Sequence, residues 1–204
     1  MPSVTGTVAV LDRADVDTDQ IIPKQFLKRI ERTGYGAFLF FDWMKDPAFE
    51  LHRYPGASIL ISGPNFGCGS SREHAAWALE DYGFSVVIAP SFGDIFRTNA
   101  VNTGLAPIAL PAEQIALLRN ESELTVDLER LEITNTRGLR VPFELDAHTQ
   151  ETLVQGLDDI ARTLMREHEI DAYEAVHSAP FDTRALVSDT RAKHRDRSAL
   201  RTGV

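Results

Sequence analysis

The sequence predicts an α/β fold built on a mixed sheet, and two patterns along the chain lead to this prediction. Between residues 58 and 110, short runs rich in β-branched residues alternate with segments of helical character. Such an alternation is typical of parallel βαβ units. After residue 111 the alternation stops, and three short strand candidates follow one another. These are expected to pair antiparallel, so the sheet should have a parallel part and an antiparallel part.

The individual elements follow from local patterns. Strands are expected where apolar, β-branched runs stand between turn residues, namely over 5–11, 58–62, 85–89, 105–110, 123–127, 130–134 and 139–144. Helices are expected over 72–82, 92–102, 112–119, 148–153 and 157–175, the last of these amphipathic. The aromatic run 34–43 fits either a helix or a strand, and we interpret it as a helix.

A single domain is expected over residues 1–177, since 204 residues suffice for one domain with a short extension. From residue 178 onward hydrophobic residues become sparse and basic residues gather. This composition predicts a poorly ordered polar, basic tail over residues 178–204.

The composition also narrows the possible partners. A net charge of −9 at pH 7 disfavours nucleic acid and anionic membranes, because both are negatively charged. It does not disfavour a small anionic substrate, which responds to local charge. No apolar run is long enough to span a bilayer, and the N-terminus has no signal-peptide pattern. The chain is therefore expected in the cytoplasm.

Metal-binding residues are scarce in this sequence. Cys68 is the only cysteine, and the six histidines show no metal-binding spacing. Because an iron–sulfur cluster needs several thiolates, we expect no metal or cofactor bound by this chain. The acidic run Asp15-x-Asp17-x-Asp19 begins like a calcium loop but lacks its glycine and its final glutamate. We expect these aspartates to form turn hydrogen bonds and to cap the segment after them.

The most informative motif is 67–74 (GCGSSREH), which joins an expected strand to an expected helix. Its glycines allow a ligand to approach the backbone closely, and a helix start presents free N–H groups to an anion. Ser70 and Glu73 have the spacing of a capping box, which predicts a helix start at Ser70 or Ser71. Arg72 is a fork-shaped donor for a carboxylate, and a bound anion would explain an arginine in a first helical turn. The motif therefore predicts a carboxylate or phosphate cradle.

Other motifs fit this stretch less well. The spacing around Ser70 does not match a nucleophile elbow, a Gly-Lys-Ser/Thr phosphate loop is absent, and Arg72 stands where a dinucleotide fingerprint needs glycine. A purely structural interpretation stays open, with the two serines as helix caps and Arg72 solvated. His74 is expected to pack rather than react. Cys68 is interpreted as a small loop residue, although a helix start beside it could lower its pKa.

Two longer runs resemble a known family. The run 67–96 (GCGSSREHAAWALEDYGFSVVIAPSFGDIF) resembles the signature of the swivelling domain of the aconitase superfamily. The run 15–36 (DVDTDQIIPKQFLKRIERTGYG) resembles the bacterial isopropylmalate dehydratase small subunits within it, and the segment 99–107 (NAVNTGLAP) agrees. The resemblance covers about residues 5–175 and implies a swivelling β/β/α domain that forms a subunit by itself.

The resemblance also implies an activity. The family interconverts 2-isopropylmalate and 3-isopropylmalate through 2-isopropylmaleate, in leucine biosynthesis. The partner would be a large subunit that binds a 4Fe-4S cluster, one iron of which acts as a Lewis acid. This chain would contribute half of a shared site for a small dicarboxylate substrate, and it would be active only with its partner.

Matching the family's motif gives roles to single residues. Ser70 would be the general base, acting as an alkoxide, and Arg72 would support it electrostatically and bind a substrate carboxylate. Gly69 and Ser71 would complete the carboxylate cradle. A further substrate-binding arginine of full-length aconitases has no secure counterpart, since only Arg13 lies near its place. The acidic run upstream could lie at the edge of the site.

The segment that would distinguish substrates follows Lys24. It comprises Phe26, Leu27, Lys28, Arg29, Ile30, Glu31, Arg32 and Thr33. Leu27 could contact an isopropyl group, and Arg29 or Arg32 a carboxylate. Each of these residues could instead belong to a solvated surface turn.

Two alternative functions stay open. The chain could be the small subunit of a related hydro-lyase, of the homoaconitase or citraconate hydratase type, which the segment 26–33 would distinguish. It could also be a non-catalytic anion-binding domain that uses residues 67–72 only as a cradle.

Overall fold

The computed structural model describes residues 1–177 except 30, 32 and 157–158. The chain divides into two units, Met1–Asp159 and the residues from Ile160 onward. The predicted tail 178–204, together with Ile30 and Arg32 of the predicted substrate segment, lies outside the described residues. That the domain extends to residue 177 stays a prediction.

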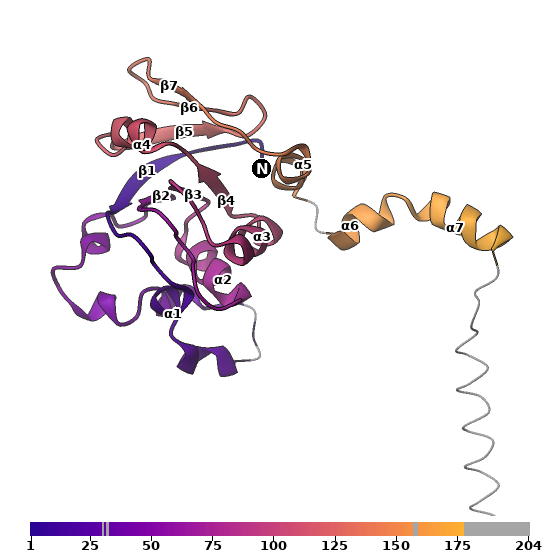
Figure 1. Ribbon diagram of the computed structural model, residues 1–204, viewed down its shortest axis with the longest axis horizontal. Helices are drawn as coiled ribbons and strands as arrows, with labels where there is room; N and C mark the ends of the chain where they lie inside the picture. Colours follow the sequence, from indigo (N-terminus) through magenta and orange to yellow (C-terminus); the bar gives the residue numbers. More distant parts are fainter. Residues whose placement is uncertain (30, 32, 157–158, 178–204) are drawn as a thin grey trace, which may run out of the picture. The chain divides into compact units, whose positions relative to one another are not determined.

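A single seven-stranded sheet runs through the first unit, in the order β4-β3-β2-β1-β5-β6-β7 (Figure 1). Strand β1 pairs parallel with β2, with Val8 beside Ile59, and antiparallel with β5, with Thr5 beside Thr125. The predicted parallel and antiparallel parts are therefore confirmed, and β1 joins them. The strands are β1 Ser3–Leu11, β2 Ile59–Ser62, β3 Val86–Ala89, β4 Ala106–Ala109, β5 Glu123–Asp127, β6 Glu132–Thr134 and β7 Arg140–Pro142.

The helices of the first unit lie between and after these strands (Figure 1). The α-helices are α1 Thr18–Ile21, α2 Glu73–Tyr82, α3 Asp94–Thr103, α4 Ala112–Leu118 and α5 Ala147–Gln155. Short 3-10 helices cover Lys24–Lys28, Gly36–Phe38, Trp43–Lys45 and Glu50–Arg53. Two further helices, α6 Asp159–Leu164 and α7 Glu167–Val176, follow toward the C-terminus.

The core lies on both faces of the sheet. Every residue of β2 and β3 is buried, as expected for strands that are covered on both sides. Because side chains alternate along a strand, Leu60 packs on the face covered by α2 and α3, whereas Ile59 and Ile61 pack with residues of α4, α5 and the antiparallel strands. The carboxyl ends of β1, β2 and β3 are thereby fixed side by side.

One predicted helix was wrong, and another is helical but interrupted. The run 34–43 forms 3-10 turns instead of a helix, because Gly34 and Phe40 have positive φ angles of 83° and 47° and the chain reverses there. Tyr35 and Phe40 of this run are buried in the core, and Phe38 and Trp43 pack against it. The predicted helix 157–175 is divided into α6 and α7 by a turn at Met165 and Arg166.

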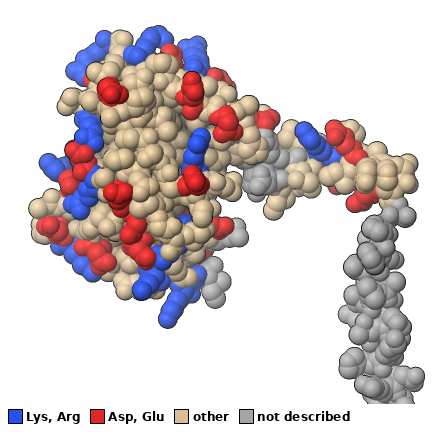
Figure 2. Space-filling model, viewed as in Figure 1, with Lys and Arg blue, Asp and Glu red and all other residues tan. Residues whose placement is uncertain are grey.

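Charged side chains of both signs are interspersed on the face of the first unit that Figure 2 shows. None of the helices in the described part of the chain is both long enough and apolar enough to cross a membrane.

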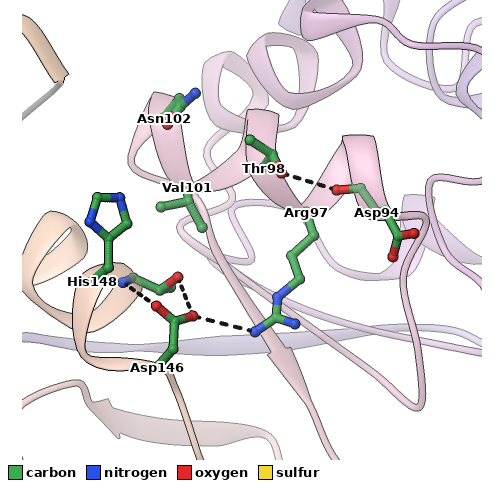
Figure 3. A pocket seen from close by; sticks show the side chains of 8 residues that line it. Asp94, Arg97, Thr98, Val101, Asn102, Asp146 and His148 are labelled. Atoms are coloured by element: carbon green, nitrogen blue, oxygen red, sulfur yellow. Dashed lines mark hydrogen bonds and ion pairs between the residues drawn. The ribbon is translucent and has the colours of Figure 1, made fainter.

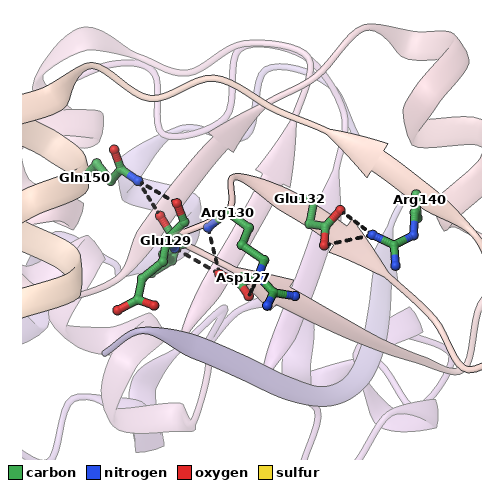
Figure 4. A network of polar contacts seen from close by, with 7 residues as sticks. Asp127, Glu129, Arg130, Glu132, Arg140 and Gln150 are labelled. Carbon is green, nitrogen blue, oxygen red and sulfur yellow. Dashed lines mark hydrogen bonds and ion pairs between the residues drawn. The ribbon is translucent and has the colours of Figure 1, made fainter.

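Polar contacts hold α5 against the antiparallel strands (Figure 4). The Gln150 amide donates to the carbonyl oxygens of Leu128 and Glu129 at 2.8 and 3.1 Å. The β5–β6 turn is closed by Asp127, whose carboxylate accepts from the backbone N–H groups of Glu129 and Arg130. These contacts satisfy buried or turn backbone groups, which stabilises the position of α5.

The first testable prediction concerns Asp146, the N-cap of α5. Its carboxylate accepts hydrogen bonds from the N–H and the hydroxyl of Thr149 at 2.9 and 2.7 Å, and these bonds lower the pKa of Asp146. Asp146→Ala should lower the free energy of unfolding by about 1 kcal/mol, measured by urea denaturation. Asp146→Asn, which keeps an accepting oxygen, should lose less.

The pH dependence gives the control for this prediction. A carboxyl whose pKa is lowered by folding stabilises the fold above its ordinary value of 3.8, and it loses that contribution as the pH falls through its folded pKa. The difference between wild type and Asp146→Ala should therefore shrink in strongly acidic buffer. Equal stability of the two proteins at neutral pH would contradict the assignment of Asp146 as a cap.

Candidate functional site

The motif 67–74 lies at the carboxyl end of β2, between the segments that follow β1 and β3. Backbone hydrogen bonds continue the β1–β2 pairing beyond the strands, so residues 13–18 and 63–68 run side by side. The bonds are Gly63 N to Arg13 O at 3.1 Å, Asp15 N to Pro64 O at 2.9 Å, Gly67 N to Val16 O at 2.7 Å and Thr18 N to Cys68 O at 2.9 Å. The acidic run and the glycine-rich motif therefore form one structure.

The segment after β3 closes the other side of the motif. Phe66 donates its backbone N–H to Ser91 O at 3.0 Å and accepts from Gly93 N at 2.9 Å. Gly67 has a φ of +73°, and a Cβ there would overlap the ring of Phe96. A residue with a side chain would be both strained and obstructed at this position. Glycine at 67 is thus required by packing.

The cradle residues themselves are open to solvent. Gly69, Ser70 and Ser71 are exposed, while the Thr18 hydroxyl holds the Ser70 carbonyl at 2.9 Å. Within the part of the chain that the structure describes, the N–H groups of these three residues and both serine hydroxyls donate to no protein acceptor. Unused donors on a fixed backbone are suited to bind an anion.

Arg72 forms the end of the cradle, and here the predicted helix start was wrong. Arg72 has extended backbone angles and is itself the N-cap, without a side-chain cap, so α2 begins at Glu73. Neither Ser70 nor Ser71 caps the helix. The Ser70 carbonyl accepts from the Thr18 hydroxyl of the neighbouring segment, and this contact accounts for the later start of the helix.

The Arg72 guanidinium pairs with the Asp19 carboxylate. Both terminal nitrogens take part, with Nη2 donating to Oδ2 at 2.9 Å and Nη1 to Oδ1. This hydrogen bond is the main cause of the lowered pKa of Asp19. The Arg72 side chain is only 13% exposed, against 49% for Asp19. The anion that an arginine at a helix start requires is therefore supplied by the protein.

The acidic run has the turn and cap roles that its sequence predicts. Asp17 caps α1 through a capping box with Gln20, and Asp15 accepts from the Asn65 amide at 2.8 Å. No group of three or more His, Cys, Asp or Glu side chains is placed to hold a metal ion among the described residues. Sequence patterns alone missed the pairing of Asp19 with Arg72. The one available signal was the family resemblance of run 15–36.

His74 and Cys68 flank the cradle without entering it. The His74 ring packs edge-on against Tyr35 and tilted against Trp77, with centroids 5.2 and 4.7 Å apart, and burial lowers its pKa. Burial raises the pKa of the Cys68 thiol, and the charges of Asp17 and Asp15 add to this. The helix that could have lowered the thiol's pKa begins only at Glu73. Cys68 is therefore not an activated nucleophile.

The described residues of the predicted substrate segment, 26–33, are partly packed on the core and partly exposed. Phe26 stacks on Phe38 with ring centroids 4.2 Å apart, and Leu27 is half-buried against the core. Arg29 lies over the rings of Phe38 and Tyr35, at 5.2 and 5.6 Å from their centroids. The remaining described residues of the segment, Lys28, Glu31 and Thr33, are exposed.

The end of this segment is fixed to α2, the helix that Arg72 precedes. The backbone N–H of Tyr35 donates to the Asp81 carboxylate at 2.7 Å. A Cβ on Gly36 would stand 2.6 Å from the backbone carbonyl carbon of Asp81, so these two segments of the chain are in close contact there. The backbone that follows the substrate segment is thus fixed to the helix that follows the cradle.

A pocket of about 380 Å³ lies elsewhere, between α3 and α5 (Figure 3). In it, Arg97 faces Asp146 at 3.9 Å, and the Thr98 hydroxyl donates to the backbone carbonyl oxygen of Asp94 at 3.2 Å. None of the predicted site residues lines it. The open cradle, not this pocket, is the candidate site.

The close approach at Gly67 gives a second testable prediction. Gly67→Ala should lower the free energy of unfolding by about 1–3 kcal/mol beyond the cost of the backbone strain, because the new methyl group would overlap Phe96. Gly104→Ala is the matched control, since Gly104 has a φ of +89° but open space around an added Cβ. Equal losses in denaturant titrations of the two variants would contradict the packing argument.

Comparison with known proteins agrees with this architecture. The model of the family described as Aconitase C-terminal domain matches residues 1–113. The 3-isopropylmalate dehydratase small subunit of Bacillus subtilis (strain 168) is 53% identical over 192 residues, 88% of this chain and 96% of that protein. The 3-isopropylmalate dehydratase small subunit of Rhodopirellula baltica is 56% identical over 184 residues, which are 83% of this chain and 94% of that protein.

A solved structure supports the same assignment. The crystal structure of 3-isopropylmalate dehydratase from Methanocaldococcus jannaschii matches with a TM-score of 0.65 and 28% identity. The match covers 84% of this chain and 99% of that one. The predicted swivelling, aconitase C-terminal-like fold is thereby confirmed. The motif at 67–74, the mixed sheet and these relatives together show that the chain belongs to the family of 3-isopropylmalate dehydratase small subunits in the aconitase superfamily.

Proposed function

We propose that this chain is the small subunit of a hydro-lyase, 3-isopropylmalate dehydratase. With a large subunit it would isomerise 2-isopropylmalate and 3-isopropylmalate through 2-isopropylmaleate, in the cytoplasm, as a step of leucine biosynthesis. The observation that carries this proposal is the likeness to small subunits of that name, at 53% and 56% identity over most of the chain. A hydro-lyase of the homoaconitase or citraconate hydratase type is the alternative that the reconstitution experiment below distinguishes.

The reaction removes a weakly acidic C–H proton, and the base we propose is Ser70. A serine hydroxyl is a poor base at neutral pH, so its alkoxide must be stabilised by oriented donors. Its exposed position, the unused N–H groups of Gly69, Ser70 and Ser71, and the nearby Arg72 charge support this role. The fixed backbone would keep these donors in place without reorganisation during the reaction.

Substrate carboxylates would be bound by two parts of the chain. The cradle offers Arg72 and the Ser71 N–H group, while the segment 26–33 offers cationic side chains beside half-buried apolar ones. Arg29 is placed over two aromatic rings, and Leu27 borders the core. This mixture of charge and apolar surface suits a dicarboxylate with a branched alkyl group, and we propose that the segment sets specificity.

The described residues of this chain do not fit an iron–sulfur cluster, since they supply one thiol and no group of metal ligands. We propose that the 4Fe-4S cluster belongs to the large subunit, where it would act as the Lewis acid that hydroxide departure needs. This chain's share is then the base and the carboxylate ligands. The small subunit would be inactive by itself.

Reconstitution tests the proposed function. The small subunit should show no activity alone, but with a cluster-bearing large subunit under anaerobic conditions it should convert 3-isopropylmalate with transient 2-isopropylmaleate absorbance. The absence of turnover in a correctly assembled pair, judged by gel filtration and iron content, would refute the proposal. Turnover of homoaconitate or citraconate in preference to isopropylmalate would favour a related hydro-lyase.

A separate prediction tests the base. Ser70→Ala should lower kcat by about 10²–10⁴-fold, the range that general-base catalysis contributes, while complex formation with the large subunit stays unchanged. Ser71→Ala is the matched control, because it removes a neighbouring exposed hydroxyl. Full activity of Ser70→Ala would exclude this assignment. A severe loss confined to Ser71→Ala would move the role by one residue.

A further inference from the structure

Asp19 has an unusually well fixed place in the fold for an exposed residue. It lies in the four-residue helix α1, which begins with the capping box of Asp17 and Gln20. The preceding Thr18 is 2% exposed and its hydroxyl binds the Ser70 carbonyl at 2.9 Å. The Asp19 backbone is therefore tied directly to the loop that carries Ser70.

The contact between Asp19 and Arg72 uses only part of the guanidinium. A guanidinium has five N–H donors, and Asp19 takes one from each terminal nitrogen in an end-on pair. The Nε–H group and the second hydrogen of Nη2 form the adjacent side-on fork. In the described part of the chain, no further acceptor contacts Arg72. One carboxylate is thus already bound, and a second can bind in the same plane.

We propose that Asp19 is a positioning residue, which holds Arg72 end-on so that its side-on fork stays directed to a substrate carboxylate. This inference rests on the proposed function and names a residue that it does not include. Asp19 offsets only part of the Arg72 charge, so the pair orients the guanidinium while Arg72 still contributes positive charge beside Ser70.

The physical reason is the freedom of a long side chain. An arginine without a fixed partner occupies many rotamers, and ordering it costs conformational entropy each time a ligand binds. With Asp19 in place, that ordering is complete before the substrate arrives. The charge of Lys24 adds a smaller favourable interaction with Asp19.

Steady-state kinetics of the reconstituted two-subunit enzyme test this inference. Asp19→Asn keeps the size of the side chain but removes the charge and one accepting oxygen. It should lower kcat/KM for 3-isopropylmalate by on the order of 100-fold, as expected for a misplaced binding group, with an increased KM. In an Arg72→Ala background, Asp19→Asn should have little further effect, because Asp19 would act through Arg72.

Asp15→Asn is the matched control. It makes the same charge change in the same acidic run, at an exposed residue that contacts Asn65 and not the cradle. The kinetics of Asp15→Asn should equal those of the wild type. The wild-type, Asp19→Asn and Asp15→Asn small subunits should melt at similar temperatures by circular dichroism.

Three results would overturn the inference. A lower KM in Asp19→Asn would show that Asp19 competes with the substrate for Arg72. Additive losses in Asp19→Asn and Arg72→Ala would show that the two residues act independently. Unchanged kinetics in Asp19→Asn, with an active wild-type pair, would remove Asp19 from the site and leave the proposed function intact. An inactive wild-type pair would overturn both.

Discussion

The parallel pairing of β1 with β2 is the constraint on which the rest of the site depends. Its register places Leu11 beside Ser62 at the carboxyl ends of both strands. Backbone hydrogen bonds continue past these ends, so that the segments 13–18 and 63–68 stay paired side by side. Two stretches that lie far apart in the sequence become the two sides of one cradle.

The same constraint limits which residues can stand next to the cradle. Beside these hydrogen-bonded segments, the closest packing contacts are made at glycines, because a side chain there would overlap backbone atoms or a core ring. Gly63 lies against the Arg13 backbone, Gly67 against Phe96, and Gly93 against Gly67. The loop is therefore a rigid platform, from which exposed hydroxyl and N–H groups can act without prior reorganisation.

A rigid but open platform also fits a shared active site. The chain contributes donors and the proposed base on its surface, while the metal ligands needed for the other half of the reaction are missing from its described residues. Such a surface gains a water-poor environment only when another protein covers it. Electrostatic stabilisation of an alkoxide depends on that exclusion of water, which gives a physical reason why the proposed activity would need the complex.

The sequence by itself determined the architecture and the location of the candidate site. Periodicity in residues 58–110 predicted the parallel units, and the glycine-rich motif before α2 predicted an anion cradle, because both depend on local patterns. The sequence failed where non-local contacts compete with local preference. The spacing of Ser70 and Glu73 predicted a capping box, but Thr18 holds the Ser70 carbonyl and delays the helix to Glu73. Only the tertiary structure brought Asp19 to Arg72, because their pairing depends on the register of two strands that no local pattern encodes.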